Sequence, residues 1–292
     1  MKLSVLIVLA ASLFLHGCAT KRTAGWDQDG AKTSLSTKEE RSLLLKAKKH
    51  WAKRHKKEQL LAAIQTYEKL LSAKPGFYVG MVYLTRGYYL LADGHTDEME
   101  QKLKHWESGI SWGEKAMATN EAFKDAVSRE EEPETVEQAL KHLTKDQMGA
   151  IYWTAVNLGK WGKNQGIATI LKYKGQIKAM VKKVESFDPD YFFSSPDRYW
   201  GAYFAVAPSF AGGDLDKSLE RFQKGIKKNP GYLGTRVLFA ELYATKKGDK
   251  ELFKKQLNIV LKAKLKKTPY LPENILERRK AKKLLTKMEE LF

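Results

Sequence analysis

Apolar residues recur at helical spacing along most of this chain, and almost no segment alternates apolar and polar residues as a half-buried strand would. Between residues 60 and 71, for example, apolar side chains return every three or four positions before the chain reaches Lys74-Pro75-Gly76. This spacing places them on one face of a helix, and that face must be buried against a neighbour. The pattern therefore predicts an all-α fold.

The ends of several expected helices resemble one another. Around residues 184–191 and 226–232, an amphipathic helix again meets a proline, followed by an aromatic residue that opens the next helix. Pro189 and Pro230 lie 41 residues apart, slightly more than the roughly 34 residues of a tetratricopeptide repeat. Small and aromatic residues also stand where such a repeat places them, at Ala63, Tyr67, Ser218, Phe222 and Gly225.

We therefore predict an α-solenoid of about five degenerate tetratricopeptide-like helix pairs. The breaks between helices should lie near Pro75, Asn120, Pro189 and Pro230. A last helix, from about Pro272 to Leu291, should cap the exposed end of the stack. Small residues on the helix at 96–119, Gly109, Gly113 and Ala116, should allow close approach of a neighbouring helix.

The first residues are typical of a secretory signal peptide, with Lys2 followed by an apolar run at 3–15. This run is too short to span a bilayer, which takes about 20 apolar residues. The segment Leu15-His16-Gly17-Cys18 resembles the bacterial lipobox, although His16 stands where a small residue is usual. Cys18 is the only cysteine, so the chain can form no internal disulfide. We expect residues 1–17 to be removed and Cys18 to be lipidated.

The expected organisation has three parts. Residues 1–17 form the signal peptide, residues 18–36 the lipidated cysteine and a small, polar, flexible tether, and residues 37–292 a tetratricopeptide-like helical domain. Because several acyl chains hold a protein stably on a membrane, the anchor should be permanent. Ala19 after the cysteine favours the periplasmic face of the outer membrane, with the inner membrane as the alternative.

The chain is strongly basic, with 52 Lys and Arg against 34 Asp and Glu. Such a charge often indicates nucleic acid as a partner, but an exported protein does not meet nucleic acid. Two interpretations of the charge remain open. In the first, the basic residues belong to solvated helix faces. In the second, some of them attract anionic lipid headgroups or an acidic protein surface.

Signatures of enzymes are scarce. The sequence contains no HExxH, no GxSxG, no phosphate-binding glycine loop and no pair of cysteines for a metal. His50 and His55 are five residues apart among lysines, a poor spacing for two metal ligands on a helix. We predict a protein that is not an enzyme and that carries no cofactor and no metal.

Arginines and aromatic residues in apolar helices are the candidates for ligand binding. Arg86, Arg198 and Arg236 each stand in such a helix, where a charge needs a partner. That partner is either an internal carboxylate or helix end, or the carboxylate of a ligand. Trp153, Asn157 and Trp161 share one helix face, more often a core than a pocket. The candidate ligand-binding residues are Arg86, Trp153, Asn157, Trp161, Arg198, Trp200, Tyr203 and Arg236.

Four stretches carry a family resemblance, at residues 152–161, 195–218, 222–243 and 272–285. On them the chain resembles the TRAP transporter T-component family (TatT), periplasmic lipoproteins built from degenerate tetratricopeptide repeats. The resemblance implies a non-catalytic accessory protein that pairs with a periplasmic TRAP substrate-binding protein, whose usual ligands are organic acids. It also implies a homo-oligomer, a trimer by analogy, with a cleft or channel through each subunit.

Two other functions stay open on the sequence alone. The first is a tetratricopeptide scaffold lipoprotein for envelope assembly, without a small-molecule ligand. The second is a periplasmic hydrolase, which would need acidic or histidine side chains gathered inside one cleft.

Overall fold

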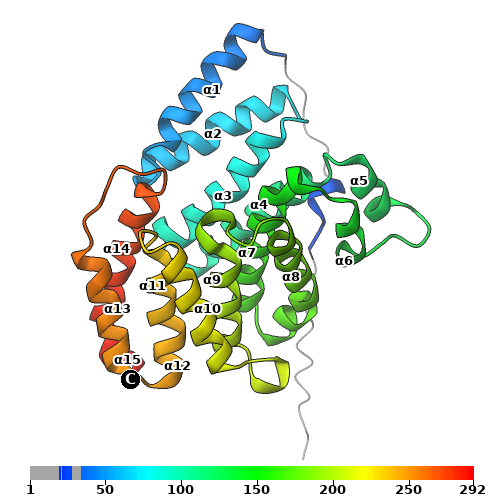
Figure 1. The fold of residues 1–292 in the computed structure, drawn as a ribbon. Helices are drawn as coiled ribbons and strands as arrows, with labels where there is room; N and C mark the ends of the chain where they lie inside the picture. Colours follow the sequence, from blue (N-terminus) through cyan, green and yellow to red (C-terminus); the bar gives the residue numbers. More distant parts are fainter. Residues whose placement is uncertain (1–19, 21, 28–33) are drawn as a thin grey trace, which may run out of the picture.

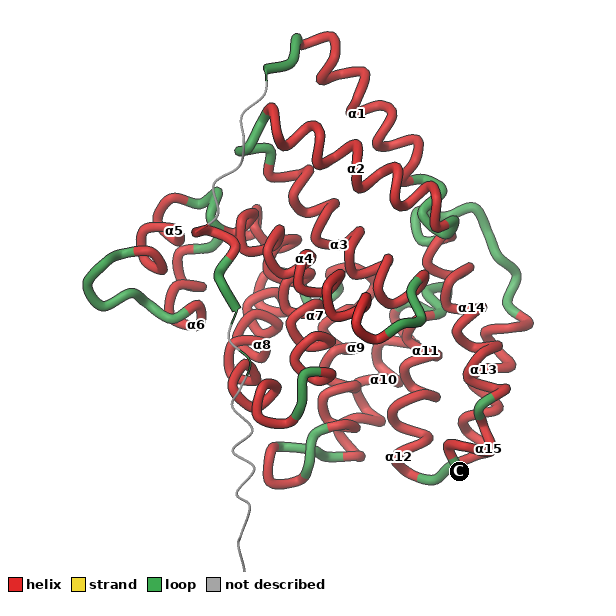
Figure 2. Tube along the Cα trace, turned by 180° about the vertical axis from the view of Figure 1, so that it is seen from behind, coloured by secondary structure: helices red, strands yellow, loops and turns green. Residues whose placement is uncertain are grey.

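The computed structural model describes residues 20, 22–27 and 34–292, and within them every regular element is a helix (Figure 1 and Figure 2). The predicted all-α fold is therefore confirmed. The predicted signal peptide and Cys18 lie outside the described residues. Among the helices that are described, none has the length and apolar character needed to cross a membrane.

The helices divide at the predicted breaks. The first half of the domain consists of α1 (Thr37–Trp51), α2 (Lys57–Ala73), α3 (Tyr78–His95), α4 (Met99–Met117), α5 (Glu121–Ser128), α6 (Val136–Ala139), α7 (Met148–Asn164) and α8 (Ile167–Phe187). The second half consists of α9 (Tyr191–Val206), α10 (Leu215–Lys228), α11 (Gly234–Leu238), α12 (Thr245–Lys247), α13 (Lys250–Lys262), α14 (Leu271–Thr286) and α15 (Met288–Leu291). Short 3-10 turns and one π-helical segment, η5 (Phe239–Ala244), complete the chain. Pro75, Asn120, Pro189 and Pro230 all lie between helices, as predicted.

Side-chain caps fix where several helices begin. Ser36 and Glu39 form a reciprocal capping box at the start of α1, so this helix begins at Thr37, the first residue of the predicted domain. Asn120 caps α5, and Asp214 caps α10 by accepting hydrogen bonds from two backbone amides. These caps satisfy amide groups that would otherwise lack partners at a helix start.

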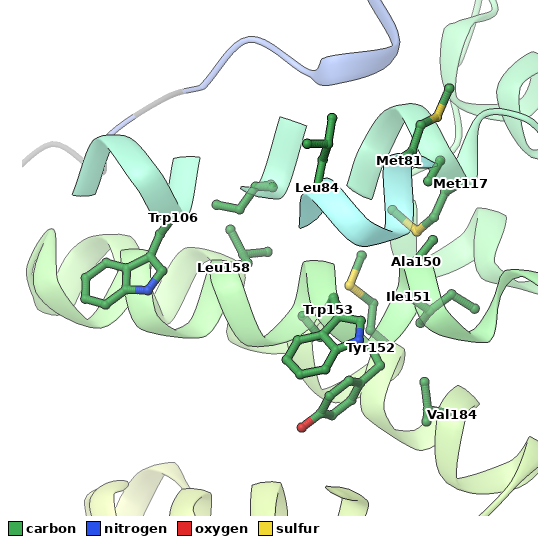
Figure 3. Close-up of a cluster of buried hydrophobic side chains, with 14 of the residues drawn as sticks. Met81, Leu84, Trp106, Met117, Ala150, Ile151, Tyr152, Trp153, Leu158 and Val184 are labelled. Atoms are coloured by element: carbon green, nitrogen blue, oxygen red, sulfur yellow. The ribbon is translucent and has the colours of Figure 1, made fainter. Parts of the chain in front are cut away.

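Successive long helices pack against each other, α1 on α2, α2 on α3, α3 on α4 and α4 on α7 (Figure 1). Glycines allow the closest approach, as predicted for the α4 face. A Cβ added at Gly113 would meet the Thr154 Oγ1 atom at 1.8 Å, and one at Gly109 would meet the Asn157 side chain at 2.6 Å. Buried side chains of α3, α4 and α7, among them Leu84, Met117 and Ile151, form the core where these helices meet (Figure 3).

Two predicted helices differ in detail. The helix expected at 232–244 is a short α11 that continues as the π-helical segment η5. The expected last helix breaks at Lys287 into α14 and α15. This last helix was predicted only to cap the end of the domain. The first half of α14 also packs against α3, which lies much earlier in the sequence. Leu276 of α14 fills the space left by Gly94 at the end of α3.

A buried carboxylate joins α14 to the beginning of the domain. The Glu273 side chain, 4% exposed, accepts hydrogen bonds from Nε and Nη2 of Arg54, each at 2.6 Å. It also accepts one from Arg86 Nη2 of α3, at 2.7 Å. Burial would raise the pKa of Glu273, but Arg86 and Arg54 lower it below its usual value, so the carboxylate stays charged.

Part of the predicted flexible tether lies against the domain instead. Arg22 forms an ion pair with Glu114 of α4 at 3.0 Å, and the Gly25 amide donates to the same carboxylate at 2.7 Å. The Trp26 ring packs edge-on against Phe123. The small, polar composition predicted a flexible segment here. Arg22 and Trp26 instead contact buried side chains of the domain, Glu114 and Phe123, and these contacts hold residues 22–27 against it.

Replacing Glu273 with Gln should destabilise the domain, because it leaves the buried Arg54 and the partly buried Arg86 without a balancing charge. We expect a loss of about 3–5 kcal/mol in the free energy of unfolding, measured by urea denaturation. Glu289→Gln is the matched control, since Glu289 forms its ion pair with Lys250 at the exposed surface. Equal unfolding midpoints for the two variants would show that the Glu273 network contributes no special stability.

Candidate ligand-binding cavity

A cavity of about 530 Å³ lies between the two halves of the domain. Helices α7, α8 and α9 form most of its wall, α11 and η5 form another side, and single residues of α3 and α14 complete it. The wall is largely apolar and aromatic, with Trp153, Val156, Ile170, Tyr199, Tyr232 and Leu238 among its residues. This size and lining are typical of a site for a small organic ligand.

Arg198 of α9 brings a positive charge to this apolar wall. Its guanidinium donates to the backbone carbonyl of Phe192 at 2.7 Å and to that of Phe193. Pro196 has no N–H group, so the Phe192 carbonyl lacks its usual helical donor and is free to accept from Arg198. The residue is 5% exposed, yet both of these partners are neutral.

The backbone that holds Arg198 is strained. Phe192, Phe193 and Ser194 have φ values of 44°, 60° and 58°, the left-handed region that residues with a Cβ atom avoid. Each such residue costs on the order of 1 kcal/mol or more, and strain of this kind concentrates at functional sites. The Tyr232 ring lies 4.4 Å from the guanidinium and the Phe192 ring 5.7 Å, so aromatic faces rather than a carboxylate surround the charge.

A cluster of charged side chains lies at the side of the cavity formed by α7, η5 and α14. Lys160 contacts Asp93 at 2.6 Å, and Lys280 contacts Glu241 at 2.7 Å and Asp93 at 4.0 Å. Burial would raise the pKa of Asp93, but Lys160 and Lys280 lower it far below its usual value. Burial would likewise lower the pKa of Lys280, but Glu241 and Asp93 raise it. Asp93 and Lys280 therefore keep their charges.

Glu277 is the exception in this cluster. Burial raises its pKa to about 7, and the attraction of Lys280 is opposed by Asp93 and Glu241. Its Oε2 atom is buried and has no hydrogen-bond partner among the described residues. A carboxyl group in this state can donate a hydrogen bond into the cavity when it is protonated.

Three of the predicted ligand-binding residues line the cavity: Trp153, Arg198 and Tyr203. The Tyr203 hydroxyl donates to the carbonyl of Ala211. Arg86 lies behind the wall, bound to Glu273 and in contact with the rings of Trp153 at 5.2 Å and Phe192 at 4.6 Å. Among the described residues, an internal carboxylate lies against Arg86, whereas the groups that contact Arg198 are neutral.

The other candidates lie elsewhere. Asn157 is fully buried and donates to the carbonyls of Thr85 and Trp153, which ties α7 to α3. Trp161 is buried against Tyr173, and Trp200 donates to Glu185 at 2.8 Å. Arg236 donates to Gln256 in a separate hollow between α10, α11 and α13. The structure does not bring these four side chains into the cavity.

Several lining residues were not among the predicted ones, namely Tyr89, Lys160, Tyr199, Tyr232, Glu241 and Glu277. A lone charge within an apolar helix, such as Glu241, is a sequence signal for a site of this kind. It does not reveal the site, because the partner of the charge comes from a distant segment, here Lys280. The described residues also contain no group of three or more His, Cys, Asp or Glu side chains placed to hold a metal ion.

A family model described as TRAP transporter T-component matches residues 57–292. The match covers most of the chain and includes every residue of the cavity wall named above. No curated protein matches the chain.

The raised pKa of Glu277 predicts a pH-dependent stability. The folded chain holds a proton that the unfolded chain releases above its usual pKa of 4.5, so this stabilisation is lost as the pH rises toward and through 7. Gln cannot ionise, so Glu277→Gln should gain roughly 2–3 kcal/mol over the wild type between pH 5 and pH 8. Urea denaturation at both pH values measures the change. The same replacement at exposed Glu251 should show no such trend, and a pH-independent Glu277→Gln effect would contradict the assignment.

Proposed function

Because the chain belongs to the TRAP transporter T-component family, we propose that it is a non-catalytic accessory lipoprotein of a TRAP-type transport system. In this role it binds a periplasmic substrate-binding protein and takes a hydrophobic organic acid into the cavity. The observation that carries the proposal is the apolar cavity with the buried Arg198, whose partners among the described residues are neutral. Both lie inside the matched residues.

The cavity suits a ligand with one acidic end and an apolar body. A carboxylate would meet Arg198, and an acyl or ring portion would pack against side chains such as Val156, Ile170 and Leu238. Lys163 and Lys174 add positive charge to the wall, and cations outnumber carboxylates around the cavity. Since a buried cation with neutral partners attracts an anion, the charge balance favours an acid over an amine.

The proposed location rests on the sequence motifs of the first residues. The signal peptide pattern and the lipobox-like Leu15-His16-Gly17-Cys18 support export and lipidation of Cys18, with the periplasmic face of the outer membrane as the destination. The pairs of packed helices support degenerate tetratricopeptide repeats as the basis of the fold. A homo-oligomer, a trimer by analogy with the family, completes the proposal.

Capture from native membranes tests the partner. The lipidated protein, extracted in mild detergent, should bring with it a periplasmic substrate-binding protein of a TRAP system, identified by mass spectrometry. Organic acids should be present in this eluate and absent from a control eluate prepared without the accessory protein. Recovery of envelope-assembly factors alone would favour the scaffold function and remove the support for a transport role.

A cavity-filling variant tests the ligand. A Cβ added at Gly159, which lines the cavity within α7, meets no atom within 4 Å, so a larger side chain there is compatible with the fold. We expect Gly159→Phe to lower the affinity for decanoate at least tenfold, or about 1.4 kcal/mol, by calorimetry. Gly159→Ala is the control, because it changes the same backbone position without filling the cavity, and it should bind like the wild type.

Decanol serves as the uncharged probe in the same titration. If Arg198 receives the carboxylate, wild-type protein should bind decanoate at least tenfold more tightly than decanol. Equal binding of the two probes would contradict a role for Arg198, and unchanged binding to Gly159→Phe would place the ligand outside this cavity.

A further inference from the structure

Exposed apolar side chains gather around the mouth of the cavity. Ile167 and Leu171 lie at the start of α8, and Val206 and Phe210 lie at the end of α9 and in the turn after it. Ile167 is 63% exposed and Phe210 is 83% exposed, the two highest values among the large apolar residues that the structure describes. Ile167, Leu171 and Val206 themselves line the cavity. These four residues form what we call the mouth patch, and an exposed apolar patch of this kind marks a contact surface.

Residue 20 lies against the start of α8, the helix that carries two residues of this patch. The Thr20 amide donates to Thr169 Oγ1 of α8 at 3.1 Å, and the Thr20 hydroxyl lies 3.5 Å from Gln165 Oε1 in the turn before that helix. The ion pair of Arg22 with Glu114 holds the next part of the segment. Residue 20 is therefore held at the start of α8, on the face opposite to the one that carries Ile167 and Leu171.

We propose that the mouth patch rests on the lipid bilayer, so that the cavity opens toward the membrane. This inference rests on the proposed lipid anchor at Cys18. Two peptide steps separate Cys18 from Thr20, which limits the distance between their Cα atoms to roughly 7 Å. Acyl chains on Cys18 lie within the bilayer, so the start of α8 must lie close to the headgroups.

The composition of the mouth fits this surface. Apolar side chains such as Phe210 enter the boundary between headgroups and acyl chains, while Lys163 and Lys174 on the cavity wall attract anionic headgroups. An amphiphilic acid then reaches Arg198 from the membrane side, without its apolar portion crossing water. Helix α1 lies at the opposite end of the molecule from the α9–α10 turn (Figure 1), so in the proposed orientation α1 is the far end from the bilayer.

Depth-dependent quenching tests this orientation in the full lipidated protein. Because Cys18 is the only native cysteine and is acylated, a cysteine introduced by substitution is the only free thiol for a fluorescent label. Phe210→Cys reports on the mouth patch, and Leu45→Cys of α1, 62% exposed, is the matched control. The variants are bound to vesicles of phosphatidylethanolamine and phosphatidylglycerol that contain a nitroxide-labelled lipid. We expect quenching at position 210 to exceed that at position 45 at least threefold.

Three outcomes would overturn the inference. Vesicle-bound protein with equal quenching at both positions contradicts the orientation and leaves the anchor intact. Protein that does not float with the vesicles contradicts the anchor, and with it this inference. Quenching at position 210 that disappears when the substrate-binding protein is added would assign the mouth patch to that partner. The decanoate titrations are independent of all three outcomes, so failure here is distinguishable from failure of the proposed ligand.

Discussion

The ion network around Glu273 is the contact on which the rest of the structure depends. It joins the last long helix, α14, to Arg54 after α1 and to Arg86 of α3, and so connects the end of the chain to the beginning of the domain. Glu273, Glu277 and Lys280 stand at positions i, i+4 and i+7 of one helix and therefore share a face. The same docking thus brings Glu277 to the cavity wall and Lys280 against Asp93 and Glu241.

The cavity that results combines two kinds of polar environment. The charged side chains of Asp93, Lys160, Glu241 and Lys280 largely neutralise one another, so they shape the cavity more than they attract a ligand. Arg198 differs, because strained backbone carbonyls orient it without cancelling its charge. An anion is attracted to such a group, whereas the neutralised cluster offers it little.

Features with a local cause could be predicted from the sequence. Prolines and capping residues such as Asn120 end and begin helices through their own backbone chemistry, so the breaks and the all-α fold could be predicted. Contacts between segments that are distant in the sequence could not be predicted. Nothing near Arg22 in the sequence indicates that it pairs with Glu114. Arg86 and Arg198 both stand in apolar helices, and only the structure shows that Arg86 pairs with the distant Glu273. The π-helical turn at η5 depends in the same way on tertiary packing.

The Glu273 contacts also set an order on folding. Glu273 is 219 residues from Arg54 and 187 residues from Arg86, among the longest sequence separations of any contact in the domain. A chain that emerges with its N-terminus first therefore carries both arginines without their acceptor until almost all of it has appeared. Contacts of such long range form slowly, since the entropy of closing the loop comes before any gain. The first helices to be synthesised must consequently be among the last to reach their final packing.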